Sequence, residues 1–169
     1  MALLLLAVAL VAAQRLLELR LSRRNERRAR ARGAVEYGRE HYPAMVALHA
    51  LWLLSTLAEG ALRGPDFPAL WYVPLAAFLL AQPLRYWAIL ALGDSWNVRV
   101  LVVPGARRLR RGPYRYLSHP NYLVVAVEVA AFPLVFGAWV TALVFTVLNA
   151  AFLYVRVRAE ERALRELAR

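Results

Sequence analysis

Long apolar stretches, separated by blocks rich in arginine, limit what this chain can fold into. Inside a bilayer every backbone N–H and C=O group must be paired within the protein, so an apolar stretch of about 20 residues crosses as a helix. The sequence therefore predicts an all-α integral membrane helical bundle with about five transmembrane segments. The apolar stretches are 1–17, 42–59, 69–92 and 121–156, the last being long enough for two helices.

The composition agrees with a membrane protein and excludes several other classes. Hydrophobic residues make up 61% of the chain, well above the roughly 45–50% of soluble domains. All 22 basic residues are arginine and the net charge is +11, but these arginines lie in blocks between apolar stretches, as in cytoplasmic loops, so no nucleic-acid partner is expected. The absence of cysteine excludes disulfides, thiolate metal sites and a cysteine nucleophile, and no metal is expected.

The arginine blocks also predict an orientation. Residues 18–40, 93–120 and 156–169 hold most of the arginines and are expected on the cytoplasmic side of a bacterial inner membrane, with the N-terminus outside and the C-terminus inside. The first block has the composition of a helix that lies on the cytoplasmic surface beside anionic headgroups. An alternative for residues 1–17 is a signal peptide, although the basic residues that should precede its apolar part are missing.

Polar side chains inside the predicted spans are candidates for function or for helix packing. His49 is either functional or hydrogen-bonded to a neighbouring helix. Arg85 either extends to the cytoplasmic interface or pairs with a carboxylate, for which Glu128 and Glu59 are the candidates. Glu128 itself either guides a substrate or hydrogen-bonds a neighbouring helix.

Residues 121–156 are predicted to form a tight helical hairpin, because Pro133 and Gly137 interrupt an otherwise apolar stretch. Acids and arginines alternate at helical spacing in 156–169, so the second arm is expected to continue as an amphipathic tail against the cytoplasmic loops. The whole chain, 1–169, is expected to form one domain.

The polar stretch Gly112–Tyr122 lies at the mouth of this hairpin. It carries three tyrosines, a histidine and two prolines, which are residues that shape a pocket better than they build a solvated link. Where the hairpin's second helix emerges, Arg156 and Glu160 are four residues apart and share a face. We therefore expect a cation, a carboxylate and an aromatic loop to converge at the boundary between lipid and cytoplasm.

The spacing of these residues resembles a known family. Gly112-x-Tyr114, His119-Pro120-x-Tyr122 and Arg156-x-x-x-Glu160-Glu161-x-x-Leu164 look like the signature of the isoprenylcysteine carboxyl methyltransferase family of integral membrane methyltransferases. The apolar hairpin between the blocks is also similar, and the resemblance is specific over residues 93–164. It implies a methyltransferase that uses S-adenosylmethionine, with a cofactor-binding part at about 93–169.

The resemblance also implies roles for individual residues. Arg156 and Glu160 would form the catalytic pair, with Glu160 on the cofactor and Arg156 facing the acceptor. Residues implied to contact the cofactor are Tyr114, His119, Pro120, Asn121, Tyr122, Glu160 and Leu109. The segment 106–109 would contact it mostly through its backbone. Many members have arginine before the His-Pro pair where this chain has Ser118, so another residue such as Arg115 would have to replace that arginine.

General chemistry is compatible with these roles. Tyrosine faces attract a sulfonium cation, Glu160 can bind the cofactor's ammonium group, and Arg156 can hold a carboxylate acceptor through two hydrogen bonds. A carboxylate acceptor needs no general base, whereas a phenol or enol would need His119 or a glutamate to remove its proton.

Each implied role has a structural alternative. Arg156 and Glu160 are also spaced as an ordinary surface pair worth only about 0.2–0.5 kcal/mol. His119-Pro120 is also a common way to begin a helix. Tyr116 fits the aromatic belt of a membrane boundary and is left out of the site.

The sequence thus predicts an S-adenosylmethionine-dependent O-methyltransferase that acts at the membrane on a lipophilic small molecule or lipidated substrate. The acceptor would be the carboxylate of an isoprenylcysteine-like substrate or a hydroxyl of a polyketide lipid, with Arg156 and Glu128 as candidate substrate contacts. An N-methyltransferase acting on phospholipid amines is an alternative. A rival of another class is a noncatalytic membrane scaffold or transporter.

Overall fold

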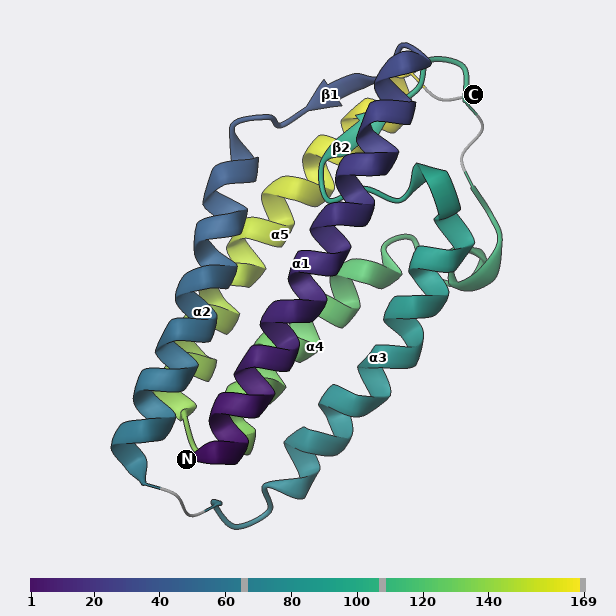
Figure 1. Cartoon of the computed structure of the whole chain (residues 1–169). Coiled ribbons are helices and arrows are strands. Elements are labelled where there is room, and N and C mark those ends of the chain that lie inside the picture. Colours follow the sequence, from purple (N-terminus) through teal and green to yellow (C-terminus); the bar gives the residue numbers. More distant parts are fainter. Residues whose placement is uncertain (65–66, 107–108, 168–169) are drawn as a thin grey trace.

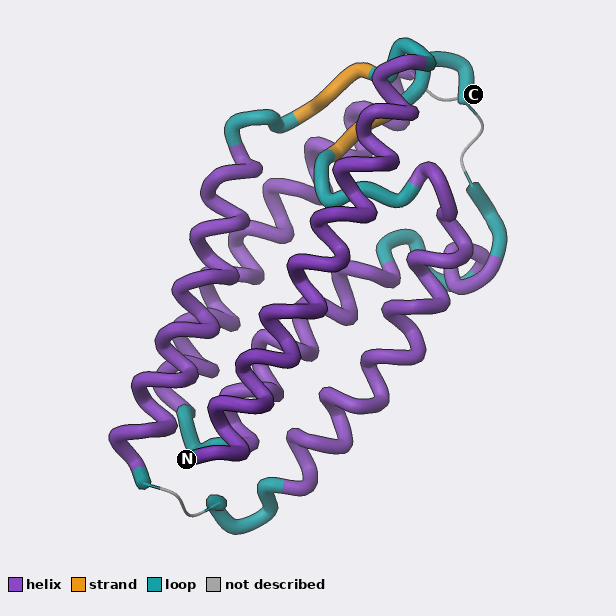
Figure 2. Tube along the Cα trace, viewed as in Figure 1, coloured by secondary structure: helices purple, strands orange, loops and turns teal. Residues whose placement is uncertain are grey.

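The computed structural model describes residues 1–64, 67–106 and 109–167, and within them the chain is a bundle of five long helices (Figure 1). Two short strands and two 3₁₀ turns occupy the loops (Figure 2). The helices are α1 (Ala2–Ala31), α2 (His41–Arg63), α3 (Tyr72–Leu92), α4 (Pro120–Val135) and α5 (Trp139–Leu167). The strands are β1 (Val35–Tyr37) and β2 (Val100–Val102), and the turns are η1 (Gly93–Ser95) and η2 (Gly112–Arg115).

The predicted all-α membrane bundle is confirmed. Helices α1, α2, α3 and α5 are long and apolar enough to cross a membrane. Helix α4 has 16 residues, or about 24 Å at 1.5 Å per residue, which is short of the roughly 30 Å apolar core. It packs mainly against α3 and α5. The N-terminus and the α2–α3 and α4–α5 connections lie at one end of the bundle, and both strands lie at the other (Figure 1).

Helix α1 differs from the expectation for residues 18–40. The arginine-rich segment does not form a separate helix on the membrane surface; it continues the first span as one 30-residue helix, Ala2–Ala31. Residues 2–31 contain neither glycine nor proline, and arginine favours helix, so nothing in the sequence ends the helix before Gly33, whose φ is +80°. The rest of the segment turns into β1, which pairs antiparallel with β2.

The predicted hairpin and tail are confirmed. Helix α4 ends at Val135 and α5 begins at Trp139, with Gly137 at φ +70° in the turn between them. Helix α5 then continues without a break to Leu167, and its buried Ala163 packs against Val100 and Val102 of β2. The two-stranded sheet therefore covers the amphipathic tail.

A group of ion pairs inside the bundle decides between the two alternatives for Arg85, which pairs with Glu128. Arg85 does not extend to the interface: it is 2% exposed, and its guanidinium bonds both carboxylate oxygens of Glu128 and those of Glu18, with 3.1 Å to Glu18 Oε2. Arg15 of α1 also reaches Glu128, at 2.8 Å. Two arginines and two glutamates from α1, α3 and α4 thus pair with one another.

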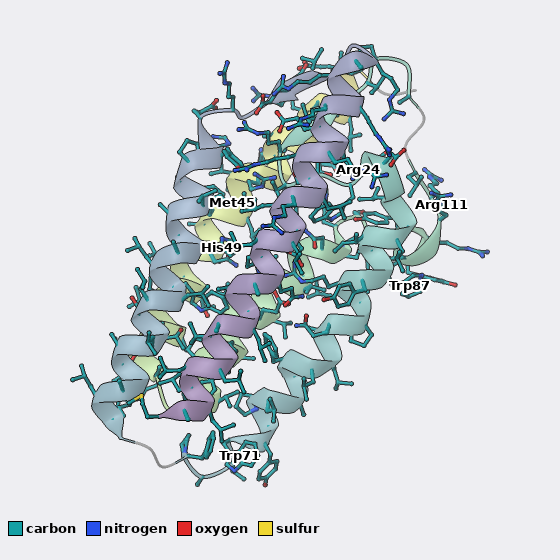
Figure 3. All side chains as sticks on the ribbon, viewed as in Figure 1. Arg24, Met45, His49, Trp71, Trp87 and Arg111 are labelled. Carbon is teal, nitrogen blue, oxygen red and sulfur yellow. The ribbon has the colours of Figure 1, made fainter. Side chains whose placement is uncertain are left out.

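Glu59 and His49, the two other candidates inside the spans, both have hydrogen-bond partners. Glu59, the second candidate partner of Arg85, instead accepts the backbone N–H groups of Val140 and Thr141 at 3.1 and 2.7 Å, and so caps the start of α5. His49 Nδ1 lies 2.9 Å from the Met45 carbonyl of its own helix (Figure 3). The apolar core around them includes Val11, Trp52, Val129, Phe132 and Phe145.

Candidate functional site

A cavity of about 520 Å³ opens at the end of the bundle that carries the strands. Its wall combines the ends of α1 and α3, the chain from η1 through β2, the loop before α4, and the C-terminal part of α5. Among the described residues it is lined by Ala29, Arg32, Leu92, Asp94, Ser95, Asn97, residues 99–103, Ala106, residues 109–110, residues 114–118, Tyr122, Arg156, Glu160 and Leu164.

The His-Pro turn and helix α5 meet at this cavity. The Tyr122 hydroxyl donates a hydrogen bond to Glu160 Oε2 at 2.6 Å, and His119 Nε2 lies 2.9 Å from Glu161 Oε1. The His119 ring stacks on the Tyr122 ring with centroids 5.4 Å apart. Pro120 occupies the first turn of α4, where a missing N–H group costs nothing. Residues about 40 positions apart in the sequence are thus in direct contact.

Arg156 lines the cavity and is 6% exposed. Its Nη2 donates to the Val98 carbonyl at 2.7 Å, and its guanidinium carbon lies 5.9 Å from the centroid of the Tyr122 ring. One edge of the guanidinium is therefore anchored to backbone. Because a guanidinium carries five N–H donors in a fixed plane, donors remain for an oxygen-bearing ligand.

The local charges set the protonation of two loop residues. Hydrogen bonding to Glu160, supported by Glu161, raises the pKa of His119 above its ordinary value. Burial, with a smaller contribution from the Glu160 charge, raises the pKa of Tyr114 well above that of a free phenol, so Tyr114 stays neutral. The site thus holds a tyrosine that can donate a hydrogen bond beside a carboxylate.

The raised pKa of His119 predicts a pH dependence of stability. Because the pKa of His119 is higher in the folded protein, protonated His119 contributes to the free energy of unfolding. This contribution is complete below the unfolded-state pKa, near 6.5, and is lost as the pH rises through the folded-state pKa. We expect the thermal unfolding midpoint in detergent to fall over that range, and the fall to shrink in His119→Asn. An unchanged profile in His119→Asn would contradict the assignment.

Gly112 lets the loop approach α3 closely. Its φ is +56°, and a Cβ at this position would lie 2.7 Å from the Ala91 Cβ. The neighbouring Arg111 donates from Nε to the Ala91 carbonyl at 2.7 Å, beside Trp87 near the end of α3 (Figure 3). Only glycine combines this backbone angle with so close a contact.

The structure brings some of the predicted site residues to the cavity but not others. Those that line the cavity are Tyr114, Tyr122, Arg156, Glu160 and Leu109. His119 precedes α4, and Pro120 and Asn121 begin it; none of the three is among the described lining residues. The Asn121 Oδ1 atom is buried without a hydrogen-bond partner among the described residues. Glu128 belongs to the ion pairs inside the bundle.

Several other residues of the loop before α4 also line the cavity. Ala106 and Leu109 line the cavity, whereas residues 107–108 of the predicted backbone-contact segment lie outside the described residues. Ser118, which precedes His119, lines the cavity, and so does Arg115, which was expected to replace the arginine that many family members have at that position. Tyr116, which was left out of the site, also lines it, although it is 74% exposed.

Sequence reasoning placed residues 94–103 within the predicted cofactor-binding part, 93–169, but named none of them as a wall of the cavity. This stretch has no recognisable motif, and its role follows from its position between the ends of α1 and α5. Sequence reasoning missed the contribution of α1. A signal was present there: Ser22 and Asn25 are the only uncharged polar residues among 18–31.

A family model and two bacterial proteins match this chain. The family model described as the isoprenylcysteine carboxyl methyltransferase (ICMT) family matches residues 73–166. The uncharacterized protein YpbQ of Bacillus subtilis is 42% identical over 162 residues, covering 95% of this chain and 96% of that protein. An uncharacterized protein of Haemophilus influenzae is 27% identical over 94% of this chain and 93% of its own length. No solved structure matches.

Proposed function

Since the chain belongs to the isoprenylcysteine carboxyl methyltransferase family, a family of membrane methyltransferases, we propose that it is an S-adenosylmethionine-dependent O-methyltransferase acting on a lipophilic acceptor. We further propose that its site faces the cytoplasm, with the N-terminus outside, because the cavity lies among the arginine-rich loops. Membrane lipid surrounds the protein and would deliver the acceptor.

One observation carries this proposal: a cation and a carboxylate from one helix reach the same cavity as the aromatic loop. Arg156 and Glu160 of α5 both line it, and Tyr122 bonds Glu160. The cavity volume, about 520 Å³, falls within the roughly 300–1,000 Å³ of small-molecule sites. Two ligands held in such a space can be aligned for transfer, which is where most of the rate gain of a displacement reaction arises.

The residues of the cavity fit the cofactor. When bound, S-adenosylmethionine supplies an activated methyl group on a sulfonium. The Glu160 carboxylate would accept the ammonium group of its methionine part, and the faces of Tyr114 and Tyr122 would attract the positive sulfur. Burial and the Glu160 charge keep Tyr114 neutral, so its hydroxyl can donate a hydrogen bond to the cofactor.

The charge of the cavity favours an anionic acceptor. Among the described lining residues there are five arginines, at 32, 99, 110, 115 and 156, against the two acids Asp94 and Glu160. Arg99 is paired with Glu36, and Asp94 with Arg28, so the excess of arginines remains when these ion pairs are set aside. Such a surface attracts a carboxylate or phenolate and repels a cationic amine. Arg156, with one edge anchored to Val98, can orient an acceptor oxygen with its remaining donors. We therefore favour O-methylation over methylation of a phospholipid amine.

The site also favours catalysis over transport. The ion pairs of Arg85 and Glu128 lie deep in the bundle, as in a transporter, but neither residue lines the cavity, and each is paired with a partner of opposite charge. A cross-link between helices explains them without a permeation path.

Calorimetry and product analysis test the proposal. Purified protein in detergent should release or absorb heat with S-adenosylhomocysteine, and incubation with methyl-labelled S-adenosylmethionine and a lipid extract of Bacillus subtilis should label a carboxyl or hydroxyl lipid. No heat and no labelled lipid would refute the proposal. A labelled phospholipid amine would favour the alternative acceptor instead.

A further inference from the structure

Two polar side chains of α1 are buried although they lie in its arginine-rich part. Ser22 is 2% exposed and Asn25 is 1% exposed, and at three positions apart they share one face of the helix. Arg24, between them, is exposed. Because burying a hydroxyl or an amide is unfavourable unless it is hydrogen-bonded, both side chains need specific partners.

Asn25 bonds the chain that follows α3. Its Nδ2 donates to the Gly93 carbonyl at 3.1 Å and to the Trp96 carbonyl at 2.8 Å. These carbonyls belong to η1 and to the residue after it, and that of Gly93 also accepts the Trp96 N–H within the turn, at 3.1 Å. Asn25 thus fixes the start of the wall segment, residues 93–99.

Ser22 bonds the next part of the wall segment. Its hydroxyl donates to Asn97 Oδ1 at 2.8 Å and accepts the backbone N–H of Val98 at 3.1 Å. Asn97 returns a hydrogen bond from Nδ2 to the Ser22 carbonyl at 3.1 Å. Two groups of Ser22 therefore bond this part of the wall segment: its hydroxyl accepts the Val98 N–H, and its carbonyl accepts the Asn97 side chain.

The same wall segment holds the arginine of the site. The Val98 carbonyl accepts Arg156 Nη2 at 2.7 Å, and Asn97 lines the cavity beside Arg156. A long side chain keeps one orientation only when its donors are anchored. Ser22 and Arg156 therefore bond the N–H and the carbonyl of the same residue, Val98. Asn97 Oδ1, which accepts the Ser22 hydroxyl, also accepts the N–H of Arg99 at 2.9 Å, in the peptide that carries the Val98 carbonyl.

We infer that Ser22 and Asn25 are positioning residues that set the place of Arg156 through the Val98 carbonyl. This inference rests on the proposed function, in which Arg156 orients the acceptor. It assigns a role to α1, which lies outside the residues that the family model matches. A displacement of about 1 Å in a positioning group can cost on the order of 100-fold in rate, so loss of the Ser22 hydroxyl should appear in turnover.

Ser22→Ala tests the inference directly. With methyl-labelled S-adenosylmethionine and a Bacillus subtilis lipid extract, its maximal rate should fall about 10- to 100-fold, while the Kd for S-adenosylhomocysteine stays within about threefold by calorimetry. Ser22→Thr, which keeps a hydroxyl, should restore most of the rate. Ser55→Ala, the same change on α2 away from the cavity, is the matched control and should behave as wild type.

A second background separates positioning from a general loss of structure. If Ser22 acts through Arg156, Ser22→Ala should lower the rate by no more than about twofold in an Arg156→Ala protein, because the interaction is already gone. Full additional loss in that background would overturn the inference. So would a rate in Ser22→Ala equal to that of Ser55→Ala, or equal losses of rate and of nucleotide affinity.

Hydrogen exchange distinguishes failure of this inference from failure of the proposed function. A wild-type protein that neither binds nucleotide nor methylates lipid would refute the function alone. Amide exchange in residues 93–99 then decides the positioning: it should be at least about tenfold faster in Ser22→Ala than in Ser22→Thr or Ser55→Ala. Equal exchange in all three variants would overturn the positioning whatever the activity shows.

Discussion

Replacing Glu160 with glutamine is expected to weaken S-adenosylhomocysteine binding about 10- to 100-fold. A hydrogen bond to a charged group contributes roughly 1.5–3 kcal/mol, and about 1.4 kcal/mol corresponds to a factor of ten. Glutamine keeps the shape of the side chain and can still accept the Tyr122 hydroxyl that lies 2.6 Å from Glu160 Oε2. The loss would therefore report the negative charge, measured as a change in Kd by calorimetry.

Glu166→Gln is the matched control for this variant. Glu166 lies on the same helix and also accepts a tyrosine hydroxyl, that of Tyr37 at 2.6 Å, but at an exposed position. The affinity of the Glu166→Gln variant for S-adenosylhomocysteine should stay within about twofold of wild type, because surface interactions contribute little. Equal weakening in Glu160→Gln and Glu166→Gln would mean that the charge of Glu160 does not contact the cofactor.

Arg156→Ala should separate the two members of the pair. If Arg156 orients the acceptor, the variant should keep nucleotide affinity within about threefold and lose turnover by at least about 100-fold. Arg158→Ala, on the same helix with an exposed contact to Tyr154, should retain both. Loss of nucleotide affinity to the same extent as in Glu160→Gln would contradict the division of roles between Arg156 and Glu160.

Removing Arg85 should destabilise the protein more than any surface substitution. Arg85→Leu leaves Glu18 and Glu128 inside the bundle with only Arg15 as a cation between them. Breaking a buried ion pair by removing one partner costs about 3–5 kcal/mol, because a buried charge is left uncompensated. The free energy of unfolding in detergent, or the thermal midpoint, measures the loss.

Two further variants make this prediction specific. Arg28→Leu removes an exposed pair with Asp94, N–O distance 2.5 Å, and should cost no more than about 1 kcal/mol. The double variant Arg85→Leu and Glu128→Leu removes one charge of each sign and leaves the Arg15–Glu18 pair, so it should recover at least about half of the lost stability. A double variant no more stable than Arg85→Leu would show that packing, not charge, holds this region.

Local sequence patterns predicted much of the architecture. The apolar stretches predicted the spans, because hydropathy over about 20 residues is a property of each segment by itself. Pro133 and Gly137 predicted the hairpin for the same reason, since a break in a helix depends on the residues at the break. The motif from Gly112 to Tyr122 and the pair Arg156 and Glu160 predicted which side chains would gather, although their contacts with a cofactor and an acceptor stay predictions.

The tertiary structure alone decided which polar groups meet inside the bundle. Arg85 bonds Glu128 across 43 residues of sequence, and Arg15 reaches Glu128 across 113. No local pattern encodes the rotation and depth of two helices, on which such a contact depends. The inclusion of residues 18–31 in α1 was missed for the same reason. An arginine-rich segment is equally compatible with a separate surface helix and with a continuation of the span, and the hydrogen bonds of Ser22 and Asn25 to the wall segment distinguish the two.

The sequence by itself therefore determined that this is a helical membrane protein of a methyltransferase family, with its chemical groups concentrated around the hairpin mouth. Only the tertiary structure decided that α1 and residues 93–103 complete the cavity and that four charged side chains neutralise one another between the helices. The physical reason is that hydropathy is a property of each segment by itself. A hydrogen bond or an ion pair instead requires two atoms from distant segments to lie within about 3 Å of each other.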